Sequence, residues 1–130
     1  MKISLYILAI IISLFKTQSD KINKILIEHV DYDLETVYKI NCRDFEKQFG
    51  SSMHKRVVTN ISDIHRFCEF EKKLKVNNKK YHPDVRVKII IYKDDGTKDI
   101  LCSDGGNYAE LNGNPMLIND DFIAFIKKIQ

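Results

Sequence analysis

The sequence predicts an α+β domain, in which an antiparallel-dominated sheet of five to six strands packs against two main helices and one short helix. The clearest evidence is the stretch 84–103, DVRVKIIIYKDDGTKDILCS, where Val87, Ile89 and Ile91 alternate with other side chains at the period of a strand with one buried face. The Asp-Gly pair at 95–96 is a hairpin signal, because the turn needs positive φ. The order of strands and helices along the chain favours an antiparallel α+β sandwich.

The composition is that of a single globular domain, which we place at residues 20–130. The chain has 130 residues, of which 44% are hydrophobic and 30% charged, and a chain of this length buries about two-thirds of its unfolded surface. Two of the 21 basic residues, Lys2 and Lys16, precede the domain, which therefore carries 19 basic and 18 acidic residues. This balance argues against nucleic acid as a partner, because nucleic-acid binding requires concentrated positive charge.

Residues 1–19 are predicted to form a secretory signal peptide. Lys2 supplies a positive charge, residues 3–15 are apolar throughout, and small residues occupy positions −3 and −1 of a cut after Ser19. A helix over the apolar run rises only about 20 Å, less than the ~30 Å hydrocarbon core of a bilayer. A buried core helix and an uncleaved anchor remain as alternatives. We favour export, which makes the mature chain secreted or periplasmic, without a transmembrane span.

The strands outside the hairpin are predicted from short runs of apolar or alternating side chains. Such runs occupy 24–30, 35–40 and 53–59. A further short strand is expected over 107–111, after a turn at 104–106. Together with the arms of the hairpin, these segments make up the sheet.

Three helices are predicted from capping residues and apolar spacing. A short helix occupies 43–49, the main helix occupies 62–75, and the last helix begins after Asn119, a good N-cap that is followed by two aspartates. The apolar stripes of the two longer helices are Ile64, Phe67, Cys68 and Leu74, and Phe122, Ile123, Ile126 and Ile129. We expect the last helix to dock on the sheet and the opposite sheet face to stay partly open.

The second face of the central hairpin is also partly apolar. Ile90, Tyr92 and Leu101 are assigned to it. We therefore expect part of the chain to cover this face as well, because apolar surface is favourably removed from water.

The three cysteines allow one disulfide and leave one thiol over, and the sequence does not determine the pairing. Cys68 and Cys102 are interpreted as small buried core residues, whereas Cys42 lies at a strand-to-helix junction. Cys42 is the only candidate nucleophile, and we do not favour it because a cysteine nucleophile needs a histidine base. The four histidines are scattered and have no catalytic motif around them: His29, His54, His65 and His82.

No catalytic, cofactor-binding or metal-ligating residue is assigned. His65 and Cys68 lie on the same side of a helix, but no second pair with ligand spacing accompanies them. The Asp-Gly sequences at 94–96 and 104–106 are better explained as turns than as calcium ligands. None of the acidic residues is marked out as a glycosidase pair.

The candidate binding surface lies in the middle of the chain, where basic residues surround an aromatic one. It comprises either the loop of Tyr81 and His82 with Arg86, or the sheet face that carries Ile90 and Tyr92. Basic blocks are weak signals, and a solvated helix end followed by a loop explains the same charges.

The sequence favours a non-catalytic binding module whose partner is a protein or a cell-envelope component. An immunity or inhibitor protein acting on a toxin or hydrolase is the second hypothesis. A hydrolase with an unrecognised acidic pair is the third. Discrimination between them depends on whether the folded chain presents a binding surface or a pocket with convergent polar groups.

Overall fold

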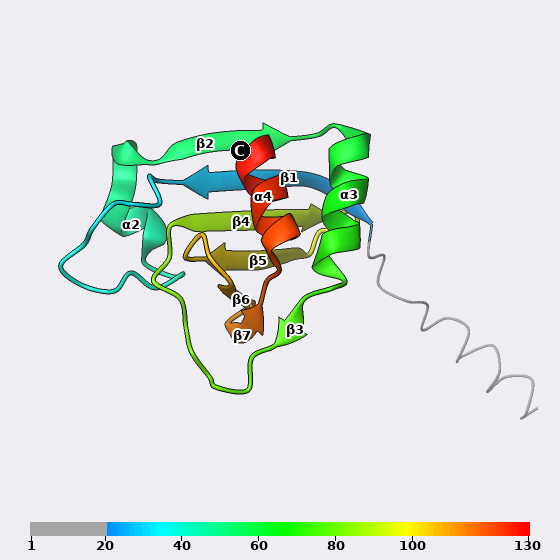
Figure 1. Ribbon diagram of the computed structural model, residues 1–130. Helices are drawn as coiled ribbons and strands as arrows, with labels where there is room; N and C mark the ends of the chain where they lie inside the picture. The colour runs from blue at the N-terminus through cyan, green and yellow to red at the C-terminus, as the bar shows by residue number, and fades with distance from the viewer. Residues whose placement is uncertain (1–20) are drawn as a thin grey trace, which may run out of the picture.

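The computed structural model describes residues 21–130, which form a seven-stranded antiparallel sheet and three α-helices (Figure 1). The strands are β1 (Ile22–His29), β2 (His54–Val58), β3 (Lys75–Val76), β4 (Val87–Lys93), β5 (Lys98–Ser103), β6 (Tyr108–Leu111) and β7 (Asn114–Leu117). Their order across the sheet is β2-β1-β4-β5-β6-β7-β3. The α+β class and the antiparallel sheet are confirmed, with more strands than expected. The predicted signal peptide, residues 1–19, lies outside the described residues.

The predicted hairpin is the centre of the sheet. β4 and β5 pair with Ile89 opposite Leu101, and the turn between them places Gly96 at φ 84°. On its other side β4 pairs with β1, where Ile89 lies opposite Ile27. β4 is therefore bonded on both edges, which explains why it carries a long run of β-branched residues.

The helices are α2 (Phe45–Phe49), α3 (Ile61–Glu71) and α4 (Asp120–Ile129). The side chain of Asn60 caps α3 by accepting a hydrogen bond from the backbone N–H of Asp63, and Asn119 caps α4 in the same way. α3 ends at Glu71 rather than at the predicted residue 75, because turns replace helical bonds over the following residues.

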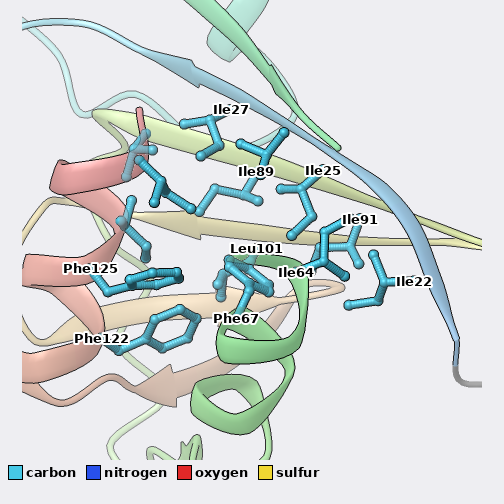
Figure 2. Close-up of a cluster of buried hydrophobic side chains, with 14 of the residues drawn as sticks. Ile22, Ile25, Ile27, Ile64, Phe67, Ile89, Ile91, Leu101, Phe122 and Phe125 are labelled. Carbon is cyan, nitrogen blue, oxygen red and sulfur yellow. The ribbon is translucent and has the colours of Figure 1, made fainter. Parts of the chain in front are cut away.

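α3 and α4 cover one face of the sheet and close the larger core (Figures 1 and 2). The ring of Phe67 on α3 meets Phe122 on α4 edge-on, with centroids 5.1 Å apart, and Phe70 stacks on Phe122 at 5.2 Å. These rings pack against the aliphatic side chains that the strands present to this face: Ile25, Ile27, Val58, Val87, Ile89, Ile91, Leu101 and Ala109. Leu101 belongs to this face and not to the opposite one as predicted, because it pairs directly with Ile89.

α2 and the segments beside it cover one end of the opposite face. Their smaller apolar cluster comprises Val30, Ile40, Phe45, Phe49, Val85 and Cys102. A disulfide joins Cys42 to Cys102, with their Cα atoms 5.8 Å apart. The expectation that something covers the second face is therefore confirmed for this end of the sheet.

One expected strand is wrong, and two short strands were not predicted. Residues 35–40 form no strand; they belong to a loop that is bonded to the side chain of Asp84 and to the backbone of Val85 at Ile40, and to Arg86 at its start. β7 and β3 were missed because β7 contains Pro115 and β3 has only two residues. Among residues 21–130, no helix has the length and apolar character needed to cross a bilayer.

Candidate binding surface

A loop of residues 31–41 follows β1 and is held by Arg86, of which only 6% is exposed. The guanidinium of Arg86 donates to both carboxylate oxygens of Asp84 at 2.9 and 3.1 Å. It also donates to the carbonyl oxygen of Leu34 at 3.0 Å and to the hydroxyl of Thr36 at 3.3 Å. The N–H groups of the buried guanidinium are thus hydrogen-bonded to both oxygens of Asp84 and to the loop itself. These bonds fix the position of the loop.

Further hydrogen bonds fix the far side of the same loop. Asp84 accepts from the backbone N–H of Ile40 at 2.7 Å, and Thr36 donates to the carbonyl oxygen of Tyr38 at 2.7 Å. Between these anchors the side chains of Val37 and Tyr38 are 91% and 79% exposed. An ordered backbone therefore presents two large apolar side chains to solvent.

Two further tyrosines extend this exposed group. The rings of Tyr81 and Tyr108 lie 4.7 Å apart, and the ammonium of Lys39 sits 4.4 Å from the centre of the Tyr81 ring. We call Val37, Tyr38, Lys39, Tyr81 and Tyr108 the tyrosine surface. Tyr81 and Tyr108 are each about two-fifths exposed, at 42% and 39%, so the tyrosine surface offers aromatic area that a partner can bury.

The predicted site residues divide between three environments. Tyr81 and His82 are exposed in the loop before β4, as a binding surface requires. Arg86 is buried and acts as the anchor of the 31–41 loop, so it offers no surface of its own. Ile90 and Tyr92 are half-buried toward the opposite end of β4, where the ammonium of Lys24 lies 4.8 Å from the Tyr92 ring.

A polar cavity at the end of β1 was not predicted from the sequence. The cavity has a volume of about 690 Å³ and is lined by His29, Val30, Asp31, Tyr32, Asp33, Leu34, Lys127 and Gln130. His29 lies opposite His54 on β2, with ring centroids 5.2 Å apart. Burial and the neighbouring His54 lower the pKa of His29, and burial raises the pKa of Tyr32 to about 12. The cavity therefore contains a neutral imidazole and a protonated phenol at neutral pH.

A buried ionic network lies on the sheet face near α2. The ammonium of Lys88 bonds to Glu46 at 2.8 Å and to the carbonyl oxygen of Cys42 at 3.1 Å. Burial and the charge of Glu46 raise the pKa of Glu28. Burial opposes the ionisation of Glu46, but its hydrogen bonds and the charge of Lys88 together outweigh burial and lower its pKa.

Glu28 and Glu46 are the acidic pair that the hydrolase hypothesis would need. Each carboxyl group shifts the pKa of the other, whereas a glycosidase needs its two carboxyls about 5–9.5 Å apart with the sugar between them. The side chain of Glu28 is also only 3% exposed. This pair is built as a structural element of the sheet and does not fit glycoside hydrolysis.

The states of the three cysteines bear on whether one of them is a nucleophile. Cys42 is bonded to Cys102 and has no thiolate to act as a nucleophile in this state. Cys68 is free and half-buried on α3, and burial raises the pKa of its thiol. A cysteine nucleophile of depressed pKa is therefore not formed by either residue.

Comparison of the chain with protein-family models, with curated proteins and with solved structures finds no match. The function must therefore be argued from the surface and the chemistry of the chain itself.

Proposed function

We propose that the protein is an exported, non-catalytic module that binds a protein partner through the tyrosine surface. The observation that carries the proposal is the exposure of Val37 and Tyr38 on a loop held by the buried Arg86. Exposed loops are usually mobile, whereas the backbone on either side of these two residues is held by hydrogen bonds at Leu34, Thr36 and Ile40.

The energetics of binding favour such a surface. Tyrosine supplies a large amphipathic contact area with only two rotatable side-chain bonds, so little conformational entropy is lost when it is buried. The backbone of the loop is already ordered by Arg86 and Asp84, which removes much of the ordering cost that a flexible loop would incur on binding. Tyr38, Tyr81 and Tyr108 therefore have the properties of interface anchors.

Two features support export. The pattern of residues 1–19 is that of a signal peptide, and the disulfide between Cys42 and Cys102 is typical of oxidising compartments. We therefore place the partner in the extracellular or envelope compartment.

Inhibition of an enzyme is the form of binding that we rank second. In Figure 1 the loop after β1 reaches beyond the end of the strands. A pre-ordered loop that extends from a rigid sheet can enter the concave site of a toxin or hydrolase, as immunity and inhibitor proteins must.

The proposal is tested by capture from the envelope and extracellular fractions, followed by affinity measurement on the identified partner. The purified protein is compared with a variant that carries Val37→Ser and Tyr38→Ser. Both residues are exposed, so the substitutions should change stability by no more than about 0.5 kcal/mol. We expect the variant to bind the partner at least about 10-fold more weakly, because two anchors are truncated.

Ile61→Ser is the matched control. Ile61 is 84% exposed but lies at the start of α3 rather than in the tyrosine surface. It should leave the affinity unchanged. Equal weakening by both changes, or a partner that binds the double variant as tightly as the wild type, would contradict the proposal. A partner that proves to be an enzyme, with activity lost on binding, would establish the inhibitor form.

A further inference from the structure

Cys42, Cys102, Glu110 and His82 meet on the sheet face that α2 partly covers. Cys102 on β5 lies directly opposite Glu110 on β6, so both side chains point to the same face. The two sulfur atoms and a carboxylate oxygen of Glu110 all lie within 4.8 Å of one another. Cys102 is fully buried and Glu110 is only 7% exposed.

A fourth donor stands beside this group. The Nδ1 atom of His82 lies 2.6 Å from Oε2 of Glu110, and the side chain of His82 is 53% exposed. The four groups thus offer two sulfurs, one oxygen and one nitrogen, with His82 on the open side. This side gives a small ion a route to the buried atoms.

We propose that reduction of the Cys42–Cys102 disulfide creates a binding site for a divalent transition metal, with zinc as the best match. Zinc prefers four thiolate, imidazole or carboxylate ligands in a tetrahedron, at about 2.0–2.3 Å from the ion. Such bond lengths place neighbouring ligand atoms about 3.3–3.8 Å apart. The carboxylate of Glu110 is already within 4.8 Å of both sulfurs, so small side-chain rotations bring these three donors into range once the sulfurs separate, and His82 adjoins Glu110.

The charges of the reduced site also favour a cation. Thiolates formed at Cys42 and Cys102 would lie against the buried carboxylate of Glu110, and like charges at this distance oppose ionisation. A divalent ion neutralises two of these charges and satisfies all three groups.

Metal binding and the disulfide exclude each other. A dithiol reductant transfers two electrons and two protons to the disulfide and becomes a disulfide itself, which leaves two protein thiols. Zinc then displaces the two thiol protons and is held by the two thiolates. In the reverse direction, a small-molecule disulfide and two protons convert the zinc-bound dithiolate to the protein disulfide, two small thiols and free zinc. The site is therefore gated by the redox state of the chain.

Cobalt(II) is the probe for the experiment, because thiolate coordination gives it a charge-transfer absorption in the near ultraviolet. The full protein is reduced, freed of excess reductant under nitrogen, and titrated with cobalt. We expect one ion per chain with thiolate absorption, displacement of cobalt by zinc, and no such absorption from the oxidised protein. Glu110→Gln and His82→Ala should each weaken cobalt binding at least about 10-fold. Losses of this size are common even for residues that only hydrogen-bond to the metal-coordinating side chains.

Cys68→Ser is the matched control, since Cys68 is the free cysteine on α3. It should retain the absorption, whereas Cys42→Ser and Cys102→Ser should abolish it. Absorption that survives in Cys42→Ser, or cobalt affinity unchanged by both Glu110→Gln and His82→Ala, would overturn the proposal. So would the absence of thiolate absorption from the reduced wild-type protein.

A second measurement applies even if the reduced chain unfolds. Circular dichroism of the reduced protein is recorded with a chelator and with equimolar zinc. Zinc should raise the melting temperature of the reduced protein, or restore its folded spectrum if it has unfolded, and should leave the oxidised protein unchanged. Equal melting of the reduced protein with and without zinc would contradict the site.

Discussion

The two faces of the sheet are held by different means. On the face under α3 and α4, aliphatic strand residues pack against the rings of Phe67, Phe70 and Phe122. On the opposite face, a disulfide and the ion pair of Lys88 with Glu46 connect the sheet to α2. The first face depends on excluded water and close packing, and the second combines a smaller apolar cluster with specific bonds between few groups.

The two kinds of contact have different consequences for the fold and for the exposed loop. Close packing tolerates little change in shape but fixes no particular loop. Specific bonds fix individual segments, and here they fix the segment that carries Val37 and Tyr38. The helix-covered face thus stabilises the sheet by packing, while the bonds on the other side of the domain both add stability and hold its loops in position.

The largest expected effect comes from neighbouring residues on β4 that face opposite sides. Ile89 is fully buried under the helices and Ile90 is only half-buried on the other face. Ile89→Asp should lower the free energy of unfolding by about 5 kcal/mol, because a charge enters an apolar core, and Ile90→Asp by much less. Urea titration of both variants measures the difference. Equal losses would break the distinction between the faces.

The disulfide gives the next effect. Cys42 and Cys102 are 60 residues apart in the chain, so replacing both with alanine should cost about 4 kcal/mol by loss of the constraint on the unfolded state. Cys68→Ala, on the helix-covered side, serves as the control and should cost much less, since that cysteine is unpaired and only half-buried. If urea titration showed the double variant as stable as the control, the second face would not depend on its covalent bond.

Arg86→Met tests the anchor of the loop. The change removes a buried cation from its partner Asp84 and should cost about 3 kcal/mol. Arg56→Met is the control, because Arg56 is exposed on β2. Thermal unfolding compares the two. A negligible loss for Arg86→Met would mean that the guanidinium does not hold the loop.

The smallest expected effect is a dependence on pH at the polar cavity. Because burial and His54 lower the pKa of His29 below its ordinary 6.5, the unfolded chain binds more protons between the two values. The free energy of unfolding should therefore rise with pH through this window and fall as the pH drops below 6.5. Unfolding of wild type and His29→Gln, measured from pH 5 to 8, should show a weaker slope in the variant. Identical slopes for the wild type and His29→Gln would refute the assignment.

The elements predicted correctly from sequence are those determined by local chemistry. The alternation in β4 with the turn at Gly96, and the cap at Asn119, depend on residues adjacent in the chain. These signals were sufficient to identify the α+β class and the central hairpin.

The features that sequence could not supply depend on distant contacts. Residues 35–40 alternate like a strand, but Arg86 and Asp84, more than forty positions away, bind Leu34, Thr36 and Ile40 and hold the segment as a loop. Arg86 and Lys88 resemble surface cations in sequence and are buried because Asp84 and Glu46 pair with them. The approach of Glu110 to Cys102 follows from strand register, and the pairing of Cys42 with Cys102 follows from how the segment before α2 docks on the sheet. The sequence alone specifies neither.

The most direct test of the account is the backbone order of the 31–41 loop, measured by nuclear magnetic relaxation at the amides of Val37, Tyr38 and Lys39. The bonds from Arg86 and Asp84 predict order parameters near the value of about 0.85 typical of rigid backbone, and a clear decrease in Arg86→Met. Order parameters below about 0.6 in the wild-type protein would contradict the claim that this loop is held ready to bind a partner.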